Sequence, residues 1–318
     1  VVLGIGTRFQ DFTTGSWSLF ANSGRRIISL NVAAYDAAKR GAIPLNADAR
    51  VGLRDLSAGM GEYHCEVPNH SLKSSWFAKV DPLTDAPKDA DGGNGLPTDM
   101  QVIGAVQRAA GENTVVMCAA GTMPGELHKL WKAGKSGSYH MEYGFSCLGY
   151  EIAGAMGIKM AQPSADVICF TGVGSYMMAN SEMATAAMMG IPFTVVVTDN
   201  RGYGCINRLQ MGCGGAEFNN LLDHAIGGEN SHIDFAKHAE AMGATSIKVG
   251  SIAELEEALS KRSGAKGPYV IVIDTDPYPS TEPGGTWWDV GVPEVSQRDE
   301  VNAARAKYET NKKRQRAD

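Results

Sequence analysis

The segment from residue 166 to residue 210, DVICFTGVGSYMMANSEMATAAMMGIPFTVVVTDNRGYGCINRLQ, constrains the fold more than any other part of the chain. Two apolar stretches, each suited to a buried strand, flank a Gly-x-Gly-Ser turn and a helical stretch. The second apolar stretch leads into Asn-Arg-Gly-Tyr-Gly. This order predicts a β-α-β unit with two parallel strands, whose following loops emerge at the same edge of the sheet. Open α/β sheets bind their ligands at that edge.

The residue types in these two loops suit a phosphate ligand. Gly172 and Gly174 let the main chain approach an anion closely, and a helix that starts near Ser175 would direct its N–H groups and the positive end of its dipole at that anion. Asn200 offers a side-chain oxygen at the end of the neighbouring strand. Together these features predict a diphosphate that is held through a divalent cation.

The same segment resembles the diphosphate-binding motif of thiamine diphosphate (ThDP) enzymes, Gly-Asp-Gly-Ser followed by Asn and then Gly-x-Gly. By that resemblance, Asn200 binds Mg²⁺ through its side chain and Gly202 through its backbone carbonyl. The cofactor-binding residues implied here are Gly172, Gly174, Ser175, Asn200, Gly202 and Tyr203. The metal-binding Asp of the family corresponds to Val173, and valine cannot ligate a hard cation, which requires oxygen.

Four longer stretches resemble one branch of the ThDP enzymes, the 3D-(3,5/4)-trihydroxycyclohexane-1,2-dione hydrolases of inositol catabolism. They span residues 117–133, 138–161, 200–210 and 274–296. The resemblance implies a hydrolytic C–C cleavage that opens the ring of a cyclic, polyol-derived 1,2-dione and gives 5-deoxy-glucuronate, with ThDP as the electron sink. It covers the carboxyl-terminal half of such an enzyme.

The resemblance also assigns residues around the thiamine rings. Gly121 and Thr122, in the loop after an expected strand, would line the aminopyrimidine, although Gly and Pro are common in any such loop. Leu148 would be the bulky apolar residue that holds the cofactor in its bent shape, whereas most leucines only pack in the core. His128 and His140 flank this region and are candidate acid–base groups, because imidazole titrates near neutrality.

Other phosphate-binding motifs fit poorly. A dinucleotide fingerprint in the first segment would need glycine where Met177 stands, and Gly4-x-Gly6 lacks the third glycine. Residues 133–136, Ala-Gly-Lys-Ser, imitate the end of a P-loop, but Lys129 occupies the place of its first glycine. We therefore expect neither nicotinamide binding nor a P-loop.

The fold class expected is α/β, a doubly wound parallel sheet in a diphosphate-binding domain, preceded by the end of a Rossmann-like middle domain. We assign residues 1–62 to the carboxyl-terminal part of the middle domain, 63–96 to a linker, and 97–318 to the ThDP-binding domain with a C-terminal arm. Trp287 and Trp288 in the arm suit either a packing role or a segment that closes over the site. The chain opens in mid-strand, so we expect it to be part of a longer polypeptide.

Strands and helices alternate after the expected linker. The first of these helices begins at Thr98, with Gln101 completing a capping box. The strands are expected at 1–6, 27–32, 43–46, 114–119, 166–171, 193–198, 245–249 and 269–274. The helices are expected at 49–60, 98–110, 147–161, 179–189, 232–242, 252–262 and 298–313.

Bulk composition excludes several classes of function. The 318 residues carry a net charge of −6, with scattered basic residues, and nothing in this pattern suggests a nucleic-acid or membrane-surface partner. No apolar run reaches the roughly 18 residues of a membrane span. Six cysteines include no C-x-x-C pair, which favours a reduced, cytoplasmic protein.

Two alternatives to the hydrolase remain. The first is another ThDP enzyme of the acetolactate synthase group, and the second is a degenerate, non-catalytic subunit, which Val173 favours. In the family, a glutamate that activates the pyrimidine ring comes from an amino-terminal pyrimidine-binding domain, usually of a partner subunit in a homo-oligomer. No part of this chain resembles that domain, so we expect the isolated chain to be inactive.

Overall fold

The computed structural model describes residues 1–22, 24–64, 69–85, 95–142, 144–228, 232–282 and 287–315. The chain divides into two compact units. The first comprises Val1–Asn69, Met211–Gly215 and Glu282–Asp318, and the second comprises His70–Gln210 and Ala216–Thr281.

The first unit contains a small parallel sheet. Its strands β1, β2 and β3 lie in chain order, with Val2 opposite Ile27 and Ile28 opposite Ile43. Phe9, Trp17 and Ile27 form its small core. The elements are β1 (Val2–Ile5), α1 (Asp11–Thr14), β2 (Ile27–Asn31), α2 (Ala34–Ala38), η1 (Lys39–Gly41), β3 (Ile43–Asn46), α3 (Ala49–Met60) and α13 (Asp299–Lys312). The expected strands and helices of this region are confirmed.

The C-terminal arm belongs with this first unit, and not with the residues from 97 onward as expected. Asp289 donates its backbone N–H to Oγ of Ser16 at 2.9 Å, and Gln315 Nε2 donates to the Ser16 carbonyl at 3.0 Å. The Trp288 ring lies 4.8 Å from that of Phe12. These contacts join residues almost 300 positions apart, which sequence periodicity does not reveal.

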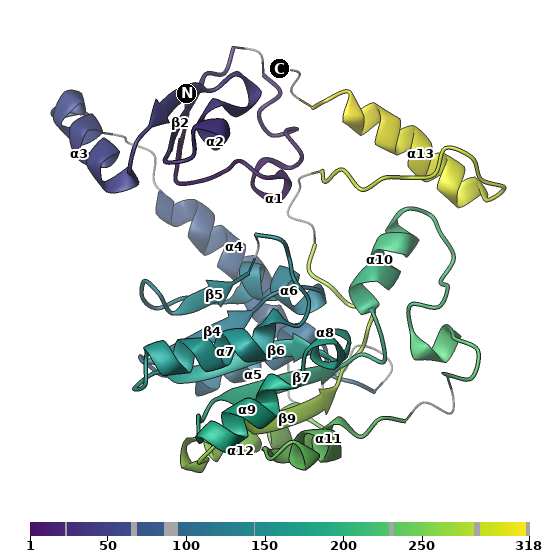
Figure 1. The fold of residues 1–318 in the computed structure, drawn as a ribbon. Helices are drawn as coiled ribbons and strands as arrows, with labels where there is room; N and C mark the ends of the chain where they lie inside the picture. The colour runs from purple at the N-terminus through teal and green to yellow at the C-terminus, as the bar shows by residue number, and fades with distance from the viewer. Residues whose placement is uncertain are drawn as a thin grey trace. The chain divides into compact units, whose positions relative to one another are not determined.

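The second unit is a six-stranded parallel sheet in the order β5-β4-β6-β7-β9-β8 (Figure 1). Its strands are β4 (Thr114–Cys118), β5 (Tyr139–Met141), β6 (Asp166–Gly172), β7 (Thr194–Asp199), β8 (Thr245–Val249) and β9 (Tyr269–Asp274). All pairings are parallel. The doubly wound α/β fold is therefore confirmed, together with every strand expected after residue 97; the short edge strand β5 was not expected.

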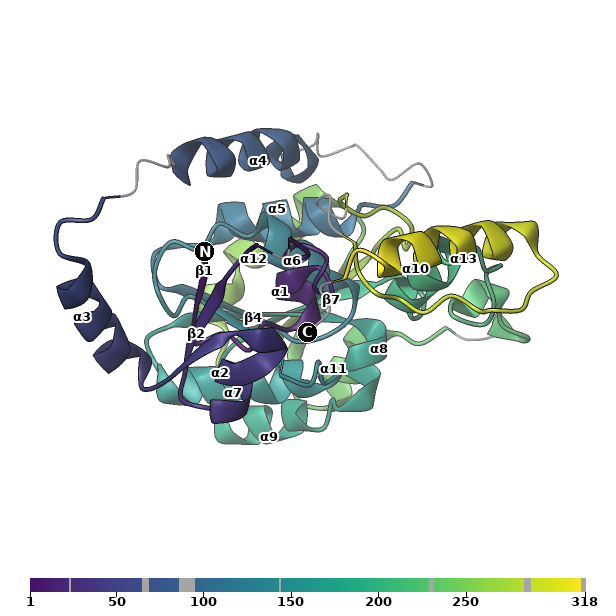
Figure 2. The same cartoon turned by 90° about the horizontal axis from the view of Figure 1, so that it is seen from above.

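Helices cover both faces of this sheet, as Figure 2 shows. On one face lie α5 (Asp99–Ala109), α6 (Thr122–Leu130) and α12 (Ile252–Ser260), and on the other lie α7 (Tyr150–Ala161), α9 (Glu182–Met189) and α11 (Phe235–Ala241). Successive strand residues alternate between the two cores: Val116 faces the first and Val115 the second. Burial on both faces explains the nearly continuous apolar strands.

Two segments refine the expectations. Residues 69–84, within the segment assigned as a linker, form helix α4 (Asn69–Thr84), and its Val80 is buried in the core. Trp76 Nε1 donates to the Lys129 carbonyl at 2.9 Å, so this helix packs on the second unit. The remaining linker residues 65–68 and 86–94 lie outside the described residues. The Thr98–Gln101 capping box at the start of α5 is confirmed.

Candidate functional site

The loops after β4 and β6 leave the sheet in opposite directions. The chain runs from β4 through α6 to β5 on one side, and from β6 through α8 (Val173–Met178) and α9 to β7 on the other. This makes the carboxyl ends of β4 and β6 a topological switch point, the place where open α/β sheets bind ligands. The predicted phosphate loop and the predicted aminopyrimidine loop both begin there.

The first of these loops is a single tight turn. Gly172 ends β6 with extended backbone, and Val173 already begins α8. Helix α8 has only six residues, so individual N–H groups of its first turn, more than a summed helix dipole, would meet an anion there. Gly174 and Ser175 contribute two of these N–H groups.

The loop after β7 brings Asn200 to the same edge. Asn200 is 6% exposed, and its Oδ1 has no hydrogen-bond partner among the described residues. A buried amide oxygen without a partner costs roughly 1–3 kcal/mol, so such an atom calls for an explanation. The predicted role of Asn200 as a ligand would provide one.

Backbone geometry fixes the rest of this loop. Gly202 has φ of 155°, forms an antiparallel bridge with Leu221, and would place a Cβ 2.4 Å from the Asn220 carbonyl oxygen. Only glycine fits there. The chain then enters α10 (Gly204–Gly212).

The two loops pack directly on each other. A Cβ at Gly174 would lie 2.7 Å from the ring of Tyr203, and a Cβ at Gly204 would lie 2.8 Å from Nδ2 of Asn200. The absence of side chains at these glycines therefore allows Tyr203 and Asn200 to take their positions. Tyr203 remains 45% exposed, available to a ligand at this edge.

The loop after β4 and the turn before α7 complete the set. Gly121 has φ of 99° and precedes α6, which begins at Thr122; the Thr122 side chain lies outside the part that the structure describes. Leu148 is 39% exposed, which is compatible with the predicted contact to a cofactor. Gly149 has φ of 91°, and a Cβ there would lie 2.8 Å from Cβ of Ala179.

One residue that the sequence did not single out connects these loops. Glu151, on the first turn of α7, is 1% exposed. Its carboxylate accepts the Ser175 hydroxyl at 2.7 Å and the backbone N–H groups of Gly149 at 3.0 Å and Ala120 at 3.4 Å. Burial raises the pKa of Glu151, while the Ser175 hydrogen bond opposes that shift. An acidic residue within the apolar helix YEIAGAMGI was the only signal for it in the sequence.

Val173, at the position of the family's metal-binding Asp, is a core residue. It is 5% exposed and belongs to the apolar cluster that also contains Tyr176 and Val197. No cluster of three or more His, Cys, Asp or Glu side chains suited to a metal ion is found among the described residues. The residues present fit a diphosphate, but for a cation they offer only neutral oxygens, from Asn200 and the Gly202 carbonyl.

The two candidate histidines lie apart. The His128 ring packs 6.2 Å from that of Tyr139, and partial desolvation lowers the pKa of His128. Tyr139 and Met141 face one core, so His140, between them on β5, points toward the other face. There it lines a cavity of about 210 Å³ with Glu142 and Tyr150, and its Nε2 has no partner among the described residues. The structure does not bring the two imidazoles together.

Glu126 and Lys129, on α6 next to the aminopyrimidine loop, have structural partners. The Glu126 carboxylate accepts the Thr281 hydroxyl at 2.6 Å and its backbone N–H at 3.2 Å. Lys129 Nζ donates to the same hydroxyl at 2.7 Å. These contacts fix the segment after β9 to α6.

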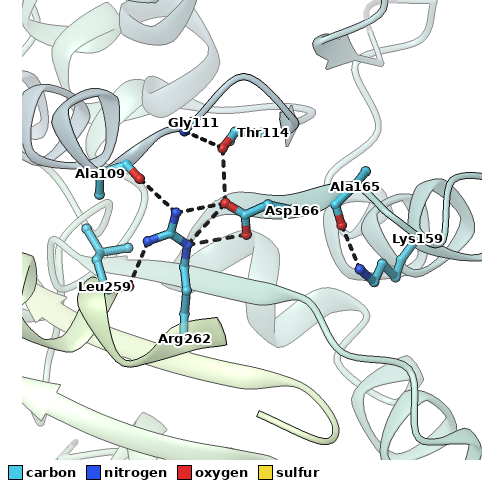
Figure 3. Close-up of polar contacts among 8 residues, drawn as sticks. All are labelled: Ala109, Gly111, Thr114, Lys159, Ala165, Asp166, Leu259 and Arg262. Carbon is cyan, nitrogen blue, oxygen red and sulfur yellow. Dashed lines mark hydrogen bonds and ion pairs between the residues drawn. The ribbon is translucent and has the colours of Figure 1, made fainter. Parts of the chain in front are cut away.

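A second cavity, of about 440 Å³, lies at the opposite, amino end of the strands. Its charged side chains are engaged within the protein: Arg262 forms an ion pair with Asp166 at 2.7 Å and donates to the Ala109 carbonyl at 2.7 Å (Figure 3). Lys159 donates to the Ala165 carbonyl at 2.6 Å. This cluster holds the sheet together and is no candidate for the active site.

Comparison with known proteins agrees with the geometry. Residues 119–273 match the family described as "Thiamine pyrophosphate enzyme, C-terminal TPP binding domain". The 3D-(3,5/4)-trihydroxycyclohexane-1,2-dione hydrolase of Geobacillus thermodenitrificans is 35% identical over 98% of this chain and 53% of that protein. The protein of the same name from Bacillus cereus is 36% identical over 96% of this chain and 52% of its own length. The chain thus spans about half the length of these relatives.

A solved structure resembles the fold. The thiamine diphosphate-dependent 4-hydroxybenzoylformate decarboxylase of Rhodococcus jostii RHA1 superposes with a TM-score of 0.64 at 20% identity, over 80% of this chain and 44% of that one. At this identity the likeness concerns the fold alone. The match to the thiamine pyrophosphate enzyme C-terminal TPP-binding domain covers residues 119–273, which include the loops after β4, β6 and β7.

Proposed function

We propose that this chain is the ThDP-binding part of a hydrolase that opens the ring of 3D-(3,5/4)-trihydroxycyclohexane-1,2-dione to 5-deoxy-glucuronate in myo-inositol catabolism. The similarity to hydrolases of that name over nearly the whole chain supports the substrate. The observation that best supports the cofactor site is the buried, unpartnered Oδ1 of Asn200 at the switch-point edge.

The proposed cofactor contacts follow the loops. The backbone of Gly172, Gly174 and Ser175 would hold the diphosphate, while Asn200 Oδ1 and the Gly202 carbonyl would hold Mg²⁺. Bound ThDP supplies an electron sink for cleavage of a C–C bond next to a carbonyl. The chain's own task is to orient the cofactor and exclude water from it.

Four residues are proposed to contact the rings of the cofactor. Gly121 and Thr122 would border the aminopyrimidine, Leu148 would support the bent cofactor, and Tyr203 would close the side next to Gly174. Leu148 and Tyr203 are both partly exposed at this edge, which supports their roles. His128 and His140 remain candidate acid–base groups, and because they face different sides of the sheet, at most one of them would reach a given substrate.

The proposal includes partners beyond this chain. A glutamate from an amino-terminal pyrimidine-binding domain would activate the cofactor, and the active protein would be a homo-oligomer. A cytoplasmic location would suit cysteines that are not in disulfides, as is the case for Cys118, Cys147, Cys169, Cys205 and Cys213. No helix in the described part of the chain is long and apolar enough to span a membrane.

Two assays test the proposal. The first is titration calorimetry of this chain with ThDP, with and without Mg²⁺. Binding that depends on Mg²⁺ is expected, and its absence would favour the non-catalytic subunit. The second measures product formation by mass spectrometry, with the dione and pyruvate side by side.

The second assay uses a polypeptide in which a pyrimidine-binding domain precedes Val1 and aspartate replaces Val173. We expect ring opening that requires ThDP and Mg²⁺ and no nicotinamide, and we expect this chain alone to be inactive. Formation of acetolactate from pyruvate without ring opening would instead assign the protein to the acetolactate synthase group. Ring opening without cofactor would remove ThDP from the mechanism.

A further inference from the structure

Glu151 joins three separate loops at the switch point. Its Oε2 accepts the Ser175 hydroxyl from the loop after β6 and the Gly149 N–H from the turn before α7. Its Oε1 accepts the Ala120 N–H from the loop after β4. The Ser175 hydroxyl in turn accepts the Gly149 N–H at 2.7 Å. One carboxylate thus links the loop after β4, the loop after β6 and the turn before α7, and each of these was assigned a contact with ThDP.

Helix capping alone does not account for this arrangement. An acidic residue in the first turn of a helix does interact with that helix's own N–H groups, as Glu151 does with Gly149. Ser175 and Ala120, however, lie 24 and 31 positions away and on different elements. A local cap would need neither of them.

The burial of this carboxylate is costly. Glu151 is 1% exposed, and its carboxylate accepts hydrogen bonds from two N–H groups and a hydroxyl, none of them cationic. A buried carboxylate without a cationic partner destabilises a fold unless hydrogen bonds satisfy its oxygens. Such a carboxylate fixes the relative positions of the loops that donate to it, because each loop must place its donor within hydrogen-bond distance.

We propose that Glu151 is a positioning residue of the ThDP site, which holds the loops after β4 and β6 and the turn before α7 in place before the cofactor binds. This inference rests on the proposed function. Because the Ser175 hydroxyl is committed to Glu151 and Gly149, Ser175 would serve the diphosphate through its backbone N–H. Preorganised loops lose less conformational entropy on binding, so the effect falls on ThDP affinity.

The test substitution is Glu151→Gln, which keeps the shape of the side chain. Its amide presents an NH₂ group in place of one oxygen. Depending on how the amide is turned, either the Ala120 N–H loses its Glu151 acceptor or the Gly149 N–H keeps only the Ser175 hydroxyl as acceptor. The matched control is Glu254→Gln, on α12 and on the other face of the sheet. Glu254 also accepts a backbone N–H, from Gly250 at 2.8 Å.

Amide hydrogen exchange of the chain without ThDP provides the first readout. In Glu151→Gln, exchange at Gly149 or Ala120 should become about ten- to a hundredfold faster, as expected for a lost hydrogen bond to a charged group. In Glu254→Gln, both amides should exchange as in the parent. Unchanged exchange at both amides in Glu151→Gln would overturn the proposal, whether or not the chain binds ThDP.

ThDP affinity, measured by calorimetry with Mg²⁺ present, provides the second readout. Glu151→Gln should weaken binding by about tenfold or more, and Ser175→Ala should add little to it, because both act on the same contact. If the losses of ThDP affinity from Glu151→Gln and Ser175→Ala were additive in the double variant, Glu151 would not act through Ser175. A lower urea midpoint with unchanged ThDP affinity would reduce Glu151 to a stabilising role. If the parent itself binds no ThDP, the proposed function fails, while the exchange result still decides whether Glu151 orders the loops.

Discussion

Replacement of Val173 by aspartate is the most informative perturbation, because two large effects oppose each other. The valine is 5% exposed and belongs to the apolar cluster that also contains Tyr176 and Val197. Removing its burial costs about 1.5–3 kcal/mol. Placing a carboxylate there costs several kcal/mol more unless that group is paired. Without ligands, Val173→Asp should therefore lower the free energy of unfolding by roughly 5 kcal/mol or more.

A bound cation would reverse much of this loss. If the new carboxylate ligates Mg²⁺ next to the diphosphate, ThDP affinity should rise by on the order of 100-fold, an additional stabilisation of about 2.7 kcal/mol at saturating ligand. Neither ThDP alone nor Mg²⁺ alone should have this effect, because each provides only part of the coordination shell.

Urea unfolding with all four combinations of ThDP and Mg²⁺ measures both effects. Val173→Thr is the matched control, because it buries a hydroxyl in nearly the same volume without adding a carboxylate. The control should lose stability and gain no extra response to ThDP with Mg²⁺. Equal stabilisation of Val173→Asp and Val173→Thr by the two ligands would refute the assignment of position 173 to the metal.

Three further outcomes test other parts of the structure. Asn200→Ala should abolish Mg²⁺-dependent ThDP binding in calorimetry and change the urea midpoint little, because its buried Oδ1 has no partner to lose; retained binding would place the diphosphate elsewhere. Burial raises the pKa of Asp99 to about 6, so its contribution to stability is complete below about pH 4 and is lost, by roughly 3 kcal/mol, as the pH rises through 6. Asp99→Asn should flatten the unfolding free energy between pH 4 and pH 7, and an unchanged slope would contradict this assignment. Arg262→Met should lower the unfolding free energy by about 2–3 kcal/mol, because Asp166 loses a charged partner, and leave ThDP affinity unchanged; a loss of affinity would show that the amino-end cluster affects the site.

The sheet was predictable from sequence because its signal is local. Strands such as Thr194–Asp199 are apolar on both faces, and that pattern requires a covered parallel sheet whatever the rest of the chain does. The glycines at 174 and 202 were equally visible, and the close contacts of the first and the conformation of the second demand glycine. The apolar strands and the glycines were therefore enough to predict the two loops after β6 and β7.

Long-range polar contacts were not predictable. Glu151 looks like one acidic residue in an apolar helix until the fold brings Ser175 and Ala120 to it. His128 and His140 seemed to flank one site, but the alternation of side chains along β5 separates them. Trp76 and Val80 mark a packed helix in a stretch whose polar composition suggested a linker.

The Arg262 cluster also has a kinetic consequence. Arg262 joins Asp166, 96 positions away, and Ala109, 153 positions away, and every pair of neighbouring strands in the large sheet is parallel. Contacts between such distant segments form late, after most of the chain entropy has been lost. Interactions absent from the folding transition state slow unfolding more than they speed folding. We therefore expect removal of the guanidinium to speed unfolding, and so to lower resistance to irreversible inactivation, more than it slows folding.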